Sequence, residues 1–278
     1  MHSSKSTPFS PNRVRPWLWA NLLSLDAPIV AILWQQLFSR SLNVPTTAAA
    51  AVTLAAAVWL IYASDRVLDA AREPGHSARH RFYRRHWRSV VPALLVALLL
   101  AGWLALTGIR KPVFYNGLAM LALVALYFAA VHLAPQFIRS FWPKEMVVAL
   151  IFSVGTCIPV WTFAPYALWA APLALFAALC WINCAAIAYW ETDALHPSTR
   201  WIGAHLGPIS LVLAAAATIL ALSTPAPASR LYLSEALSAI AFMLLARFSS
   251  ELSHDGLRVA ADAVLCTPLL FLPFAAFT

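Results

Sequence analysis

The segment Tyr62-Ala63-Ser64-Asp65-Arg66-Val67-Leu68-Asp69-Ala70-Ala71-Arg72-Glu73 closes the second long apolar stretch of the chain. Its acids, Asp65, Asp69 and Glu73, recur at every fourth residue. On a helix this spacing places the carboxylates on one face, about 6 Å of rise apart. Arginines interleave with these acids and follow them: Arg66, Arg72, Arg79, Arg81, Arg84, Arg85 and Arg88. Carboxylates bind Mg²⁺ and guanidinium groups bind phosphate oxygens, so the segment predicts a lipid diphosphate site at a membrane surface.

The composition of the chain also indicates a membrane setting. Of the 278 residues, 62% are hydrophobic and only 11% are charged, which excludes an ordinary soluble domain and favours a polytopic membrane protein. In so apolar a chain, the formal net charge of +8 fits loop charges and contact with anionic membrane lipid, and we expect no nucleic-acid partner. The 4 cysteines fall in apolar stretches, so we expect them to pack as small apolar residues.

A membrane helix needs roughly 20 mostly apolar residues. The stretches that meet this requirement are 16–38, 46–64, 89–108, 113–133, 145–163, 167–189, 204–222, 231–248 and 259–277. We therefore expect an all-α polytopic membrane protein with nine transmembrane helices in a single transmembrane domain, 1–278.

The basic residues predict the orientation of these spans. If the N-terminus is inside and the spans alternate, 15 of the 19 Lys and Arg residues fall in inner segments, and only Arg40, Arg110, Lys111 and Arg230 fall outside. This is the bias of the positive-inside rule. It predicts a multi-pass protein of a bacterial inner membrane, with a cytoplasmic N-terminus and an outer C-terminus.

The acids gather on the same inner side, although the positive-inside rule does not favour acids there. They are Asp65, Asp69, Glu73, Glu145, Glu191, Asp193, Glu251 and Asp255. A polar, cation-binding inner cavity would account for this clustering. The chain also shows a loose duplication of 13–133 in 143–248, followed by the ninth span 259–277, in which the second and sixth spans both end in acids.

The sixth span ends in Tyr189-Trp190-Glu191-Thr192-Asp193-Ala194-Leu195-His196-Pro197, the second acidic loop. Either acid could bind a metal ion, with Asn183 two helical turns below Glu191. The alternative is a plain helix end ahead of Pro197, because a residue before proline disfavours the helical conformation. The first acidic loop has a comparable alternative, in which its acids only pair with neighbouring arginines, but the strict fourth-residue spacing favours a functional site.

Two further acids, Asp26 and Asp262, lie within apolar stretches, where an ionisable residue indicates function by default. Asp26 precedes Pro28 and could instead satisfy backbone groups at a helix break. Asp262 is one turn from Arg258, so a simple ion pair is the alternative.

These features together resemble the UbiA-type intramembrane prenyltransferase superfamily over most of the chain. The resemblance rests on nine spans, an acidic motif after the second span, another after the sixth, and basic residues in both loops. Pro143-Lys144-Glu145, the stretch 199–207 and Asp262 add to it. The chain departs from the family pattern at Ile61, where the first motif usually has Asn, and in the second motif, which offers only Glu191 and Asp193.

The resemblance implies a ring of helices around a central cavity and Mg²⁺-dependent transfer of an isoprenyl group. The donor would be a prenyl diphosphate, and the acceptor a lipophilic or aromatic molecule at the inner membrane face. Asp65 and Asp69 would hold Mg²⁺, and Asp193 or Glu191 would bind a second metal ion or orient the acceptor. The expected substrate-binding residues are Arg66, Arg72, Arg79, Arg81, Lys144 and Asn183.

Two other functions remain compatible with the sequence. One is an intramembrane terpene cyclase of the same type, which would share the ionisation step but use an internal acceptor. The other is a non-catalytic lipid-binding or transport protein that keeps the fold and has lost the second motif.

Overall fold

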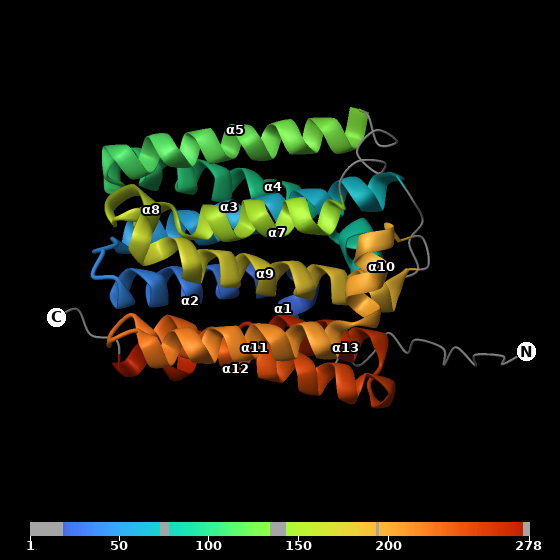
Figure 1. The fold of residues 1–278 in the computed structure, drawn as a ribbon. Coiled ribbons are helices and arrows are strands. Elements are labelled where there is room, and N and C mark those ends of the chain that lie inside the picture. Colours follow the sequence, from blue (N-terminus) through green and yellow to red (C-terminus); the bar gives the residue numbers. More distant parts are fainter. Residues whose placement is uncertain (1–18, 73–77, 134–142, 193–194, 275–278) are drawn as a thin grey trace, which may run out of the picture.

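The computed structural model describes residues 19–72, 78–133, 143–192 and 195–274, and within them it leaves out the side chains of 69–72, 78–81 and 132. Every element in these ranges is a helix (Figure 1). The elements are α1 (Trp19–Leu22), α2 (Asp26–Ser41), α3 (Ala48–Arg72), α4 (Ala78–Gly108), α5 (Lys111–Leu133), α7 (Lys144–Thr156), α8 (Ile158–Phe163), α9 (Tyr166–Glu191), α10 (Pro197–Ala204), α11 (Leu206–Ser223), α12 (Ser229–Arg247), η2 (Ser249–Glu251), α13 (His254–Val264), η3 (Thr267–Leu270) and η4 (Leu272–Phe274). The predicted all-α class is confirmed for the described chain.

Among the described residues, 6 helices are long and apolar enough to cross a membrane, namely α3, α4, α5, α9, α11 and α12. They support a multi-pass membrane protein. The other expected spans are short or interrupted: α2 has 16 residues, the stretch 145–163 is divided into α7 and α8, and 259–277 begins as α13 and continues as the short helices η3 and η4. The predicted number of nine spans and the central cavity therefore stay predictions.

Prolines account for the interruptions. Pro159 lies in the first turn of α8 and Pro268 in the first turn of η3. Proline lacks the N–H that would continue a helical ladder, and its ring clashes with the preceding turn, so it is tolerated in the first turn of a new helix. At the α7–α8 break, the indole Nε1 of Trp161 donates to the carbonyl oxygen of Val154 at 3.0 Å, which satisfies a backbone group there.

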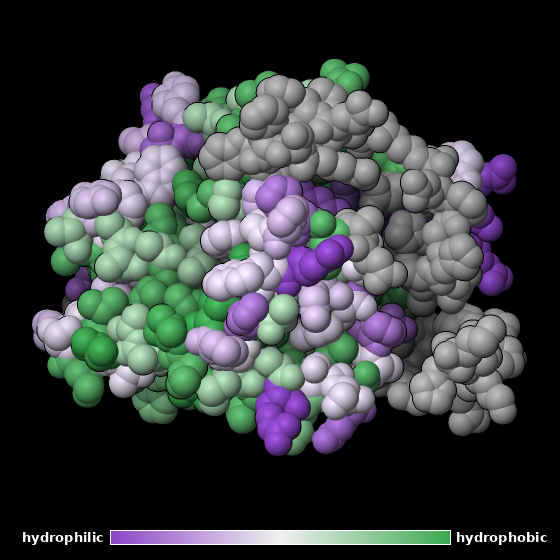
Figure 2. All heavy atoms as spheres, turned by 45° about the vertical axis from the view of Figure 1, so that its right-hand side comes forward, coloured by the Kyte–Doolittle hydropathy of each residue, from purple (hydrophilic) through white to green (hydrophobic). Residues whose placement is uncertain are grey.

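The core lies where α2, α9, α12 and α13 meet. The rings of Trp34 on α2 and Phe176 on α9 stack with centroids 4.4 Å apart, and the Trp34 indole donates to the Leu265 carbonyl at 2.8 Å. By contrast, α4 and α5 expose large apolar side chains, such as Leu99 at 73% and Leu126 at 67%. Such faces suit contact with lipid chains. Figure 2 shows hydrophobic side chains over the flank of the bundle and hydrophilic ones gathered toward the end that carries α10.

The long helices run side by side, so the bundle has two distinct ends (Figure 1). The C-terminal ends of α3 and α9 and the helix α10 lie at one end, whereas α8 lies at the other. The C-terminal ends of α3 and α9, from which the two predicted acidic loops start, therefore lie at the same end of the bundle.

This arrangement predicts opposite accessibility for Ser198 of α10 and Ser223 at the end of α11. In a parent from which the four native cysteines are removed, Ser223→Cys should react with a membrane-impermeant maleimide on sealed cells. Ser198→Cys should react only after permeabilisation, because the positive-inside bias predicts a cytoplasmic location for α10. Labelling of Ser198→Cys on sealed cells would overturn the orientation.

The contact between α9 and α10 depends on a glycine. A Cβ atom at Gly203 would overlap the base of the Tyr189 side chain, whereas one at Gly207 in α11 would meet nothing within 4 Å. Gly203→Ala should therefore lower stability by about 1–3 kcal/mol, because Tyr189 and α10 must move apart. Gly207→Ala is the matched control and should be close to neutral, because a Cβ atom there meets no neighbour in the first turn of α11. Thermal unfolding in detergent measures both, and equal midpoints for the two variants would refute this packing.

Candidate functional site

The first acidic segment belongs to a continuous helix. Helix α3 runs from Ala48 to Arg72, so both Asp65 and Asp69 lie on it one turn apart, as the fourth-residue spacing predicted. The Asp65 carboxylate lies 3.8 Å from the guanidinium of Arg66, and both side chains are only partly buried. The side chains of Asp69, Arg72, Arg79 and Arg81 lie outside the described residues.

The second acidic segment starts where α9 ends. Glu191 is the last residue of α9, and Thr192 has extended backbone, so the helix does not continue to Asp193, which lies outside the described residues. The Oε2 atom of Glu191 accepts a hydrogen bond of 2.6 Å from Nη2 of Arg258 on α13. Arg258 thus pairs with Glu191, rather than forming a simple pair with Asp262.

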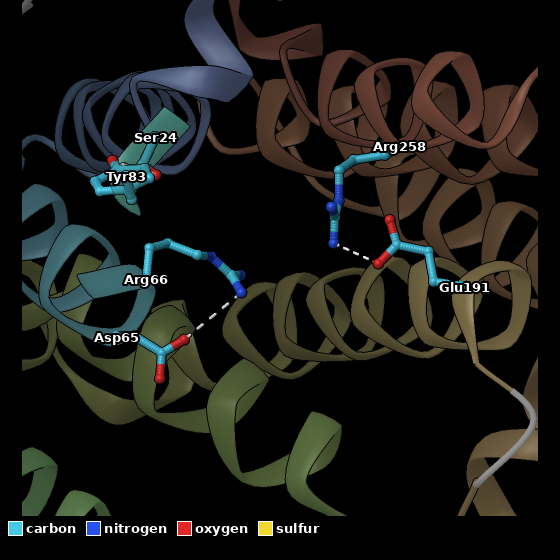
Figure 3. A network of polar contacts seen from close by, with 6 residues as sticks. All are labelled: Ser24, Asp65, Arg66, Tyr83, Glu191 and Arg258. Atoms are coloured by element: carbon cyan, nitrogen blue, oxygen red, sulfur yellow. Dashed lines mark hydrogen bonds and ion pairs between the residues drawn. The ribbon is translucent and has the colours of Figure 1, made fainter. Parts of the chain in front are cut away.

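The two acid–arginine pairs face each other (Figure 3). In this view the guanidinium groups of Arg66 and Arg258 point into the same space, with Asp65 behind one and Glu191 beside the other. Burial lowers the pKa of Arg258, the Glu191 carboxylate opposes this shift, and the positive charge of Arg66 adds to it. Two guanidinium groups that repel each other in this way are suited to a shared anion.

Deeper in the bundle, below these pairs, two further acids meet. The carboxyl groups of Asp26 on α2 and Asp262 on α13 lie within hydrogen-bonding range of each other. Asn183 of α9 donates from Nδ2 to Oδ1 of Asp262 at 3.1 Å, and Asn21 donates from Nδ2 to Oδ2 of Asp26 at 2.7 Å. The Oδ1 atom of Asn183, which is 8% exposed, has no hydrogen-bond partner among the described residues.

The turn between α1 and α2 fixes the position of Asp26. Ser24 adopts a positive φ of 55°, a costly conformation for a residue other than glycine. Its hydroxyl lies 3.1 Å from the hydroxyl of Tyr83 on α4, and the Trp59 indole donates to the Leu23 carbonyl at 2.9 Å. These contacts from α3 and α4 fix the turn, and Figure 3 shows Ser24 and Tyr83 in the same view as the two acid–arginine pairs.

A second polar link joins the start of α7 to α10. Glu145 is 7% exposed and its Oε2 atom accepts a hydrogen bond of 2.9 Å from the hydroxyl of Thr199. Tyr127 on α5 lies within electrostatic range of both Asp65 and Glu145, so this link borders the first acidic segment. Lys144 precedes Glu145 as the first residue of α7, and its side chain is exposed.

We call the group formed by Asp26, Asp65, Arg66, Asn183, Glu191, Arg258 and Asp262 the polar centre. It contains four carboxyl groups and two guanidinium groups, and this excess of acid favours a cation as well as an anion. However, no three His, Cys, Asp or Glu side chains come together as a metal site in the ranges that the structure describes. The described residues therefore do not by themselves make up a Mg²⁺ site.

A separate pocket of about 450 Å³ lies between α9, α10, α11 and α12. Its lining includes Tyr189, Trp190, Gly207 and Arg247, and it contains no residue of the polar centre. The predicted cavity is therefore not this pocket.

The structure brings together Asp65, Arg66, Asn183 and Glu191 from the residues predicted from the sequence. It adds Arg258, whose partner on α9 is 67 residues away in the chain. It also joins Asp26 and Asp262, which the sequence marked only as isolated intramembrane acids. The signal for Arg258 was weak, because an arginine just ahead of an apolar stretch is also what the positive-inside rule predicts.

Comparisons of the chain with models of known protein families, with curated proteins and with solved structures found no match.

Proposed function

We propose that this protein is a Mg²⁺-dependent intramembrane prenyltransferase, which moves an isoprenyl group from a prenyl diphosphate to a lipophilic or aromatic acceptor. The observation that carries the proposal is the convergence of Arg66 and Arg258 between Asp65 and Glu191, at one end of a bundle of apolar helices. A diphosphate in this position keeps its charge among polar groups while its apolar tail lies between the helices.

The two arginines of the polar centre would bind the diphosphate directly. Arg66 and Arg258 come from helices far apart in the chain, and together they would bind oxygens on two sides of a diphosphate. Their positive charge favours departure of the diphosphate as its negative charge develops. The remaining cations expected from the sequence, Arg72, Arg79, Arg81 and Lys144, would add positive charge for the diphosphate.

The deeper acids suit the acceptor. Asn183 has an unpartnered Oδ1 atom that can accept a hydrogen bond from an acceptor hydroxyl group. The neighbouring carboxyl groups of Asp26 and Asp262 would act as the base that takes up the proton that an acceptor loses on prenylation. Apolar helix walls around this region would keep water from the allylic cation.

Mg²⁺ belongs to the proposal through Asp65, Asp69 and Asp193, whose carboxylates are ligands that this ion prefers. It would neutralise the charge of the diphosphate. The hydropathy, the charge bias and the resemblance support three further parts of the proposal. These are a nine-span ring around a central cavity, a cytoplasmic N-terminus and a location in a bacterial inner membrane.

A second candidate is a non-catalytic lipid-binding or transport protein on the same fold. It is favoured by the 2.6 Å ion pair between Glu191 and Arg258, because an acid held by an arginine is less available as a metal ligand. The intramembrane terpene cyclase is the third candidate, and it shares every assignment above except that of the acceptor.

The three candidates give different products. The purified protein in phospholipid vesicles is incubated with prenyl diphosphates of several lengths, Mg²⁺ and a panel of lipophilic and aromatic acceptors, and the products are identified by mass spectrometry. We expect a prenylated acceptor and free diphosphate. A cyclised hydrocarbon formed without any acceptor would favour the cyclase, and saturable binding without release of diphosphate would favour the binding protein.

A further inference from the structure

The outer half of the bundle contains a buried acid that the polar centre does not use. Glu235 on α12 is 1% exposed, and neither of its carboxylate oxygens has a hydrogen-bond partner among the described residues. A carboxylate buried among apolar helices without a donor or a counter-ion is strongly disfavoured. A cation must therefore neutralise the carboxylate of Glu235.

Two other buried side chains have unpartnered oxygens. Gln35 on α2 is 2% exposed and Thr156 at the end of α7 is 1% exposed, and the side-chain oxygens Oε1 and Oγ1 of these two residues have no partner among the described residues. Glu235 lies six residues from the start of α12 and Gln35 six residues from the end of α2, so each is about 9 Å from the end of its own helix, whereas Thr156 is the last residue of α7. Helix α2 packs against α12, α7 and α8, so it connects these positions.

The α7–α8 break lies beside the acid. Cys157, which separates the two helices, is within electrostatic range of Glu235, and Thr156 is its neighbour in the chain. Interrupted helices inside membrane proteins often mark places where backbone and side-chain oxygens bind Na⁺ or protons. An interrupted helix, an unpartnered carboxylate and neutral unpartnered side-chain oxygens on the helices that pack against each other form such a place.

The neighbouring ionisable groups leave the charge of Glu235 unbalanced. Cys157 and Tyr232 are within electrostatic range, and neither can act as a cation. Helix α11 has no ionisable side chain. Arg40, on α2, donates from Nη1 to the Leu272 carbonyl oxygen at 3.2 Å. One carboxylate among neutral oxygens matches a single positive charge, whereas Mg²⁺ demands octahedral coordination and retains several of its waters.

We propose that Glu235, with the side-chain oxygens of Gln35 and Thr156, forms an intramembrane binding site for a monovalent cation, a proton or Na⁺, beside the break between α7 and α8. The bound cation connects α2, α7 and α12 in the outer half of the bundle. This site is independent of the prenyl diphosphate chemistry proposed above.

Thermal unfolding of the purified full-length protein in detergent tests the site. One series exchanges NaCl for N-methylglucamine chloride at constant ionic strength and alkaline pH, and a second varies the pH without Na⁺. If the cation is Na⁺, saturating NaCl should raise the unfolding midpoint of the wild type by roughly 5–10 °C. If it is the proton, the midpoint should fall with rising pH and not respond to Na⁺. Either response supports the proposal, provided that Glu235→Gln removes it.

The variants separate this site from other titrating groups. Glu251→Gln is the matched control, because Glu251 lies exposed in η2 and its substitution should leave both responses unchanged. The other acids of the chain are present in both proteins, so the difference between the wild type and Glu235→Gln is the readout. For a Na⁺ site, Thr156→Val should raise the half-maximal Na⁺ concentration about tenfold or more, since it removes one ligand.

If Glu235→Gln does not yield folded protein, Glu235→Asp takes its place. The aspartate keeps the carboxylate on a side chain that is one methylene shorter. This variant should therefore shift the half-maximal Na⁺ or proton concentration without abolishing the response. The proposal is overturned if the wild type responds to neither cation, or if the Glu235 variants respond as the wild type does.

Discussion

Asp65→Asn is expected to lower prenyl diphosphate turnover by about 10²–10³-fold while the protein stays folded. The asparagine has almost the same size as the aspartate but lacks the charge that would bind the proposed Mg²⁺ and balance Arg66. Removal of one well-placed electrostatic group typically costs this much in rate. Asp65 is partly exposed at the end of α3, so the change should cost little stability. Release of diphosphate from a radiolabelled substrate measures the rate, and thermal unfolding checks the fold.

Asp255→Asn provides the matched control. Asp255 lies exposed in the first turn of α13, the helix that carries Arg258. Its substitution is the same chemical change as Asp65→Asn, from a carboxylate to an amide. Its turnover should stay close to that of the wild type. If Asp65→Asn and Asp255→Asn retain equal turnover, the first acidic segment has no catalytic part and its acids only pair with arginines.

Arg258→Gln should have an effect of similar size, because it removes one of the two guanidinium groups that face the proposed diphosphate. We expect turnover to fall by about 10²-fold and the affinity for prenyl diphosphate to fall with it. Stability should fall by about 1–2 kcal/mol, since Glu191 loses its partner but its side chain is 32% exposed and can be solvated.

A double-mutant cycle with Glu191→Gln distinguishes the roles of the two residues. Glu191→Gln should cost about tenfold in turnover by itself. If Glu191 acts by positioning Arg258, the Glu191→Gln substitution should lower turnover hardly any further in a protein that already carries Arg258→Gln. If the losses of turnover in the two single variants add up in the double variant, Glu191 does not act by positioning Arg258 and is instead an independent ligand. An Arg258→Gln protein with wild-type affinity for prenyl diphosphate would remove Arg258 from the site.

The helical class and the common location of the two acidic segments follow from periodicity and charge, which depend on local sequence. Asp65 and Asp69 recur at helical spacing, and α3 continues through both of them. Hydropathy did not predict the helix breaks, because the sequence stays apolar across them. The stretch 145–163 is apolar throughout, but Pro159 ends the helical ladder, so α7 and α8 are separate helices.

The pairing within the polar centre could not be predicted, because it depends on contacts between residues distant in the chain. Asp262 is one turn from Arg258, so the sequence favoured a local ion pair. In the fold, Arg258 meets Glu191 at the end of α9, and Asp262 meets Asp26 and Asn183 instead. The spacing of residues on one helix says which side chains share a face, but only packing decides which helix that face meets.

The most direct measurement of the central claim is photo-crosslinking with a prenyl diphosphate analogue that carries a diazirine on its first isoprene unit. The label is located by mass spectrometry after proteolysis. We predict labelling at the C-terminal end of α3 and in α13, which unlabelled prenyl diphosphate suppresses and Arg258→Gln weakens. Labelling confined to the separate pocket between α9, α10, α11 and α12, or labelling that unlabelled prenyl diphosphate does not suppress, would contradict the account.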